Sequence, residues 1–155
     1  MLYLILKYIH IISSTLIFGT GLGSAFYMWR ANQSKQLPTM QFAAKNVVIA
    51  DWVFTTPAVI IQPISGFGLM HILHYPITSR WIIWSLALYV LAGACWIPVV
   101  WLQIKMHQLL KMTTCLESAW PSKRYYTYER LWFYLGWPAF IAVLIIFYLM
   151  IFKPI

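Results

Sequence analysis

Residues 131–152 read LWFYLGWPAFIAVLIIFYLMIF, and no charged side chain interrupts them. A helix needs about 20 mostly apolar residues to cross the hydrocarbon layer of a bilayer. This stretch reaches that length by itself, between Arg130 on one side and Lys153 on the other. It therefore predicts a membrane-spanning helix.

Three more stretches of the same kind precede it, at about residues 2–29, 46–73 and 81–104. The second is the least apolar and contains Pro57 and Pro63. Membrane helices tolerate proline where neighbouring groups satisfy the freed carbonyls. We expect polar connectors at 30–45, 74–80 and 105–130, although the start of the last could continue the third helix. The pattern predicts one all-α domain over residues 1–155, an integral membrane four-helix bundle.

Composition supports a membrane protein. Hydrophobic residues make up 62% of the chain and charged residues only 9%, whereas a soluble domain carries about 25% charged residues. So little charge does not cover a surface that faces water. The net charge of +8 does not indicate nucleic acid, because the basic residues stand singly between apolar runs. The expected surroundings are a lipid bilayer, with other membrane subunits or further copies of the chain as possible partners.

The basic residues also predict an orientation. Eight of the eleven Lys and Arg residues fall in the first and third connectors or beside them, and the other side holds Lys7, Arg80 and Lys153. Because loops rich in Lys and Arg stay in the cytoplasm, we expect a bacterial inner-membrane protein with both termini in the periplasm. Aromatic residues near the predicted helix ends fit interfacial belts: Trp29, Trp81, Trp132 and Tyr134.

Ionisable groups inside a bilayer are candidates for function, since inserting one costs about 2.5–3.5 kcal/mol. In the first helix, His10 shares a face with Ser14 and Gly21. The segment 19–23 (GTGLG) is expected to let another helix approach closely. His10 is then either a hydrogen-bonded residue of a packing seam or a metal ligand or proton carrier. Lys7 can extend its ammonium to the interface.

In the second helix, Asp51 and Gln62 lie on one face with Thr55 and Ser65. Two interpretations of Asp51 stay open. It forms a salt bridge, with Arg130 or Lys45, or it takes part in proton relay or substrate binding. Arg130 is the preferred partner, because it lies at the same depth and can grip a carboxylate with two hydrogen bonds.

His71 and His74 lie at the outer end of the second helix, in the same half of the membrane as His10. Two imidazoles on facing helices are what six-coordinate haem iron needs. His107 is expected to be solvated. The sequence contains no Walker motif, nucleophile elbow, HExxH or paired carboxylate, which leaves open whether the chain is an enzyme.

Several segments resemble an uncharacterised bacterial family of predicted integral membrane proteins, known as a domain of unknown function. The resemblance covers almost the whole chain and is carried by residues 7–11 (KYIHI), 18–21 (FGTG), 51–57 (DWVFTTP), 62–66 (QPISG), 95–103 (CWIPVVWLQ) and 135–140 (LGWPAF). The family implies a membrane location and no particular activity.

The Lys7–His10 spacing and the Gly21–Leu22 pair are also distantly similar to the four-helix membrane proteins that oxidise protoporphyrinogen and to copper-resistance membrane domains. That resemblance implies a link between His10 and bound haem b or a porphyrin. The arginine-rich part of the motif is matched only by Arg30, so the resemblance implies a porphyrin pocket more than the oxidase activity.

Three hypotheses follow. The first is a haem- or porphyrin-binding redox protein that uses His10, with His71 or His74 as a second ligand. The second is a non-enzymatic accessory subunit of a larger membrane complex. The third is a small copper or solute transporter in which Asp51, Gln62 and His10 line a path.

Overall fold

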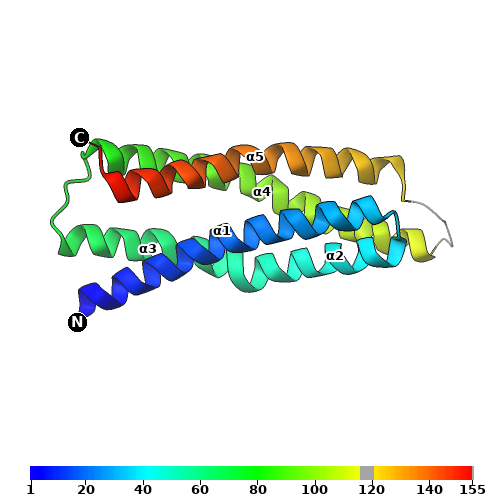
Figure 1. Cartoon of the computed structure of the whole chain (residues 1–155), viewed down its shortest axis with the longest axis horizontal. Helices are drawn as coiled ribbons and strands as arrows, with labels where there is room; N and C mark the ends of the chain where they lie inside the picture. Colours follow the sequence, from blue (N-terminus) through cyan, green and yellow to red (C-terminus); the bar gives the residue numbers. More distant parts are fainter. Residues whose placement is uncertain (116–120, 155) are drawn as a thin grey trace.

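Four long helical rods build the molecule (Figure 1). A computed structural model describes residues 1–115 and 121–154, and these contain no strand. The elements are α1 (Leu2–Ser34), α2 (Leu37–Ala50), η1 (Asp51–Thr55), α3 (Thr56–Ile72), α4 (Arg80–Cys115) and α5 (Lys123–Phe152). Because α2, η1 and α3 follow one another without a break, they form one rod. Each rod is long and apolar enough to cross a membrane, which confirms the all-α bundle with four candidate spans.

The connector expected at residues 30–45 is almost entirely helical. Helix α1 continues to Ser34 and α2 already begins at Leu37. Lys35, with a positive φ of 53°, turns the chain between them. Pro38 starts the second rod instead of preventing it, because proline in the first turn of a helix lacks only an N–H that would have no helical partner. The two rods therefore form a tight helical hairpin.

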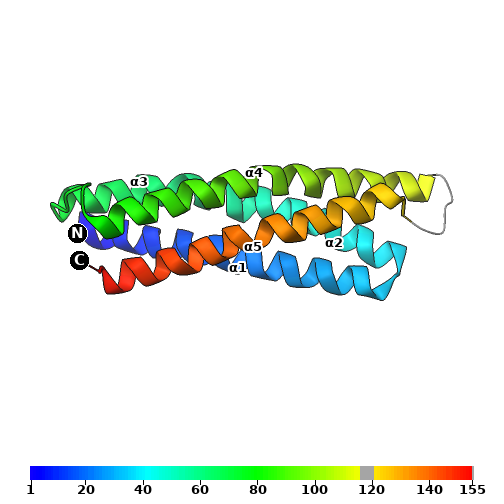
Figure 2. The same cartoon turned by 90° about the horizontal axis from the view of Figure 1, so that it is seen from above.

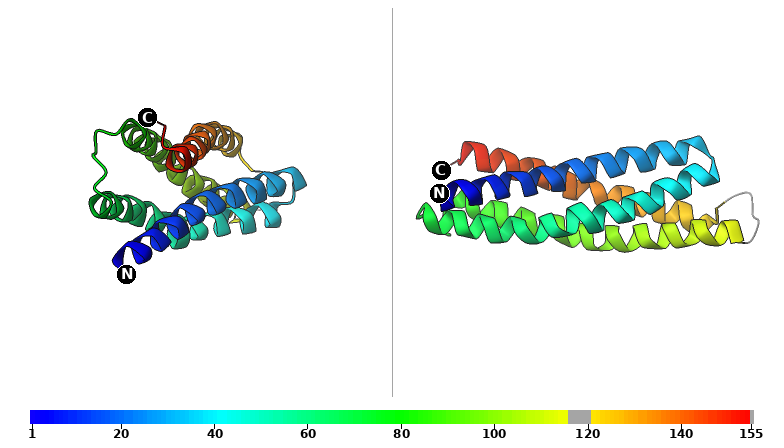
Figure 3. Two further views of the ribbon diagram at one scale, coloured as in Figure 1. Left: turned by 60° about the vertical axis from the view of Figure 1, so that its left-hand side comes forward. Right: turned by 90° about the horizontal axis from the view of Figure 1, so that it is seen from below.

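The rods are packed unevenly along their length. Helix α4 runs closely along α5, and α1 lies against α3 and α2. Both chain termini lie at one end (Figures 1 and 3), and Figure 2 shows the α1–α2 turn at the other. The main buried cluster lies toward the α1–α2 turn: Met28, Met40, Ala44, Val47, Val99, Leu102, Met106, Leu110, Tyr125 and Trp132. The half that holds the termini therefore has fewer fully buried side chains.

Hydrogen bonds connect α1 to α5 at the end of the bundle that holds the α1–α2 turn. Tyr125 donates from its hydroxyl to Asn32 Oδ1 at 2.6 Å, and Asn32 Nδ2 donates to Glu129 Oε1 at 2.7 Å. Outside the bundle, large apolar side chains face outward, such as Val90, which is 70% exposed, and Ile151, which is 74% exposed. Such a surface fits lipid and not water.

The close approach of α1 to its neighbour uses different glycines from those expected. A Cβ added at Gly19, Gly21 or Gly23 would meet nothing within 4 Å, so the segment 19–23 does not form the predicted tight contact. The contact is made instead by Gly66 and Gly68 of α3. A Cβ there would lie 3.2 Å from His10 Cε1 and 3.1 Å from Leu6 Cδ1, respectively. The contact lies there because α1 packs against α3 with the face that carries Leu6 and His10.

Candidate functional site

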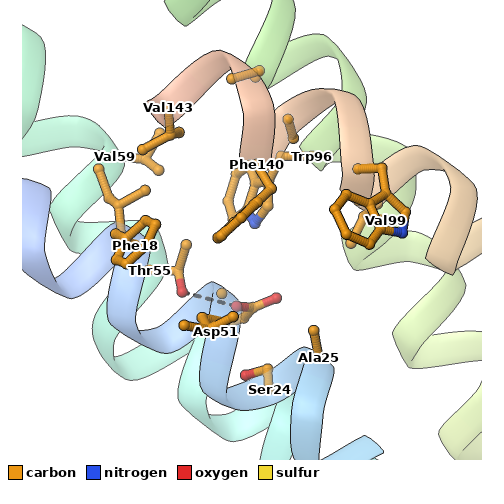
Figure 4. A pocket seen from close by; sticks show the side chains of 18 of the residues that line it. Phe18, Ser24, Ala25, Asp51, Thr55, Val59, Trp96, Val99, Phe140 and Val143 are labelled. Carbon is orange, nitrogen blue, oxygen red and sulfur yellow. Dashed lines mark hydrogen bonds between the residues drawn. The ribbon is translucent and has the colours of Figure 1, made fainter. Parts of the chain in front are cut away.

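A cavity of about 240 Å³ lies in the middle of the bundle, and all four rods contribute to its wall (Figure 4). Asp51 of η1 lies at its edge and is only 5% exposed. Thr55 Oγ1 donates a hydrogen bond of 2.8 Å to Asp51 Oδ1, drawn as a dashed line in Figure 4. The carboxylate thus points into the protein, as the cost of burying its charge in lipid requires.

The predicted salt bridge of Asp51 is absent. Arg130 and Lys45 are both exposed, and Asp51 Oδ2 has no hydrogen-bond partner among the described residues. The reason lies in the rotation of α5. At 100° per residue, Arg130 and Trp132 point in nearly opposite directions, and Trp132 is the residue that faces the interior, being 6% exposed. Trp132 is therefore a buried cavity residue and not a member of the predicted interfacial belt.

Four buried polar atoms of the cavity wall have no hydrogen-bond partner within the described part of the chain. They are Asp51 Oδ2, Gln103 Oε1, Trp96 Nε1 and Trp132 Nε1. Leaving one such atom unpaired costs about 1–3 kcal/mol, and each calls for an explanation in a native structure. Two of these atoms are acceptors and two are donors. Gln103 lies beside the Asp51 carboxyl, and its neutral amide can donate toward it.

Glycines and aromatic rings shape the rest of the cavity. Gly21, Gly93 and Gly136 come from three different helices, and an added Cβ would meet nothing within 4 Å at any of them. Phe18 and Phe140 stack with ring centroids 5.2 Å apart. Among the described residues, the cavity wall contains no Lys, Arg or His, and Asp51 is its single acidic residue. The aromatic residues that line it are Phe18, Tyr89, Trp96, Trp132, Phe133, Trp137 and Phe140.

A local irregularity of the second rod positions Asp51. Residues Asp51–Thr55 form a π-helical turn. Pro57 follows it, and a proline ring clashes with the carbonyl four residues earlier, here that of Val53. Widening the turn relieves that clash. Such single π-turns within α-helices occur often at functional sites.

His10 takes part in a separate polar network between α1 and α3. Its Nδ1–H donates to Ser65 Oγ at 2.9 Å, and its Nε2 accepts from the Gln62 amide at 3.2 Å. This assignment follows from Ser65, whose hydroxyl already donates to the Ile61 carbonyl at 2.8 Å. Ser13 completes the network by donating to Gln62 Oε1. Both ring nitrogens of His10 are thus hydrogen-bonded to side chains of α3.

A second cavity, of about 410 Å³, lies beside this network toward the chain termini. His10, Gln62, Lys7 and Lys153 line it, and Tyr89 lines both cavities. The Lys153 ammonium donates to the Tyr75 hydroxyl at 3.0 Å and lies 4.8 Å from the centre of that ring.

The structure does not bring the predicted second haem ligand to this cavity. His71 and His74 are exposed, and neither lines it. No group of three or more His, Cys, Asp or Glu side chains that could hold a metal ion occurs in the described ranges. Ligation of iron by His10 Nε2 requires the Gln62 amide to turn away. His107, expected to be solvated, is half-buried, and its Nδ1 has no hydrogen-bond partner among the residues that the structure describes.

Sequence reasoning missed four residues of these sites. Ser13 is buried and bonded to Gln62, whereas the expected Ser14 only bonds within its own helix. The spacing of three residues from His10 to Ser13 was the available signal. Gln103, Trp96 and Trp132 carried no signal that separates them from other polar or aromatic residues of membrane helices.

The fold and its buried polar sites define the class: a four-helix integral membrane protein with cavities between its helices. The chain belongs to the family described as "Predicted integral membrane protein (DUF2269)", whose family model matches residues 4–154. This confirms the family resemblance seen in the sequence. The comparison with curated proteins and the comparison with solved structures each found no match.

Proposed function

We propose that this protein binds a largely apolar ligand within the membrane, in the cavity at Asp51. The observation that carries the proposal is the set of four buried, unpartnered polar atoms, which all belong to residues of this cavity. Binding sites for small molecules are mostly apolar hollows with a few placed polar groups. A ligand with both donor and acceptor atoms would satisfy groups that the protein leaves unpaired.

The position of the site supports a ligand that arrives from the bilayer. The cavity lies midway along rods that are long enough to span a membrane. Its wall is mainly aromatic and aliphatic, and glycines of three helices keep it open. A bundle that serves only as a scaffold would be more stable with apolar side chains in this space, because each buried polar group without a partner lowers the free energy of unfolding.

A cavity-filling variant tests the proposal. The probe is 1-bromo-4-propylbenzene, whose bromine quenches the cavity tryptophans on contact, and the protein is held in zwitterionic lipid nanodiscs. Gly136→Leu places a side chain in the cavity, whereas Gly19→Leu, on the exposed side of α1, is the matched control. We expect saturable quenching in the wild type and in Gly19→Leu, and its loss in Gly136→Leu.

A ligand site at Asp51 is overturned if neither this probe nor a cationic probe of the same shape gives saturable quenching, or if the quenching saturates equally in Gly136→Leu. The accessory-subunit hypothesis then becomes the leading one. Copurification of further membrane proteins with the chain would test it.

The second cavity favours a second candidate, a haem or porphyrin beside His10. Lys7 and Lys153 line the same cavity as His10, and their ammonium groups suit the carboxylates of a porphyrin. When bound, haem would supply electron-transfer chemistry, while His10 would serve as its single histidine ligand from this cavity. An absorbance spectrum of the purified protein with haem supplied, oxidised and then reduced, tests this. A Soret band that His10→Ala removes supports it, and a colourless wild type overturns it.

A further inference from the structure

We infer that the ligand of the Asp51 cavity is an organic cation, a protonated amine on an apolar, ring-bearing body. This inference rests on the proposed function and adds the charge of the ligand to it. Three features of the cavity carry the inference: a carboxylate without a counter-ion, two unpartnered acceptor oxygens on neighbouring side chains, and a wall of aromatic rings.

The first feature is the charge balance. Asp51 is only 5% exposed, and within the described ranges neither a basic side chain nor a histidine lines the cavity. Buried charges in proteins are paired or hold a cation, because desolvating a lone charge is very costly. Its hydrogen-bonding neighbours, the Thr55 hydroxyl at Oδ1 and the Gln103 side chain, are both neutral. A cationic ligand would complete the pair at Oδ2.

The second feature is the hydrogen-bond pattern. Asp51 Oδ2 and Gln103 Oε1 are acceptors on neighbouring side chains, and neither oxygen has a hydrogen-bond partner within the described part of the chain. An ammonium group carries three donors and no acceptor, so it suits a site whose unpartnered carboxylate and amide oxygens are acceptors. The indole N–H groups of Trp96 and Trp132 remain for acceptor atoms on the body of the ligand.

The third feature is the aromatic wall. A cation within about 6 Å of a ring centre is attracted to the face of the ring, most strongly by tryptophan. Three tryptophans of α4 and α5 line the cavity: Trp96, Trp132 and Trp137. Phe18 and Phe140 add a stacked pair at one side, visible in Figure 4. A neutral apolar ligand would gain from the rings but would leave the carboxylate unpaired.

A matched pair of probes separates charge from shape. The cation is 2-(4-bromophenyl)ethylammonium, and its neutral counterpart of the same shape is 1-bromo-4-propylbenzene. Both are titrated against the wild type in zwitterionic nanodiscs at neutral pH, with tryptophan quenching as the readout. Each Kd is referred to the concentration of the probe in the lipid phase. We expect the cation to bind at least tenfold more tightly than the neutral probe.

Asp51→Asn keeps the shape of the side chain and removes its charge. In this variant we expect the cation to lose its tenfold advantage over the neutral probe. Equal binding of the two probes to the wild type, or tighter binding of the neutral one, overturns the cation inference and leaves the ligand site standing. If neither probe gives the saturable quenching that Gly136→Leu removes, the proposed function itself fails. The wild-type comparison decides between these outcomes even if Asp51→Asn folds poorly.

Discussion

The hydroxyl of Tyr89 donates a hydrogen bond of 2.5 Å to the backbone carbonyl of Val59. In a regular helix this carbonyl would accept from the residue four positions later, which here is Pro63, and proline has no N–H to give. The Tyr89 side chain of α4 thus supplies the hydrogen bond that Pro63 cannot give to the Val59 carbonyl of α3. Because Tyr89 lines both cavities, the same bond fixes the wall that the two cavities share.

Tyr89→Phe tests this role of Tyr89. The variant leaves the Val59 carbonyl unpaired, and we expect it to lower the free energy of unfolding by about 1 kcal/mol, typical of hydrogen bonds between membrane helices. In a Pro63→Ala background the alanine N–H can reach the carbonyl, so the same change should cost little. A double-mutant cycle measured by unfolding in mixed micelles gives the coupling. An equal cost in both backgrounds would contradict this role.

The contact of Gly66 with His10 gives a second prediction. Replacing an interior helical glycine by alanine usually stabilises a helix by about 0.5–1 kcal/mol. We expect that gain for Gly19→Ala, since a Cβ there meets nothing within 4 Å. At Gly66 the new Cβ lies 3.2 Å from His10 Cε1, so the ring must shift and its bonds to Gln62 and Ser65 lengthen.

Thermal unfolding in a mild detergent should therefore place Gly66→Ala below the wild type and Gly19→Ala at or above it. The opposite order would mean that the imidazole is held loosely, with room to move away from α3.

The orientation in the membrane is a third prediction, drawn from the distribution of basic residues. The structure places both termini at one end (Figure 1), as an even number of spans requires. Reporter fusions after Lys111 should then report cytoplasm, and fusions at Pro154 should report periplasm. Reversed signals at both sites would refute the assigned orientation.

Hydropathy sufficed to predict four membrane helices, since a long apolar run has few other stable forms in a bilayer. It did not predict which face of each helix points inward. In a water-soluble bundle an apolar stripe marks the inner face, whereas these helices also carry large apolar side chains on their outer faces. The sequence therefore pointed to Gly19–Gly23 for the close contact that Gly66 and Gly68 make. The charge of Asp51 correctly predicted that its helix turns this residue toward the protein interior. The predicted salt-bridge partner of Asp51 was wrong.

The last prediction concerns two acceptors on neighbouring side chains that lack a hydrogen-bond partner within the described residues, Asp51 Oδ2 and Gln103 Oε1. Asp51→Asn turns one acceptor into a donor, and its new amide can bond to the Gln103 oxygen. We expect the ligand-free protein to gain about 1 kcal/mol or more in unfolding free energy, the scale of relieving an unpaired buried group. Gln103→Glu makes the opposite change, because it adds a second acidic group beside the first. It should lower stability, since like charges at close range disfavour each other.

Unfolding of both variants and the wild type, at neutral pH without added ligand, measures the two effects. A destabilised Asp51→Asn would show that the carboxylate already has a partner within the folded chain, and it would remove the main support for a ligand at this site. A stabilised one would mean that the protein keeps Asp51 at a cost to its own stability, which is common where a residue serves binding instead of folding.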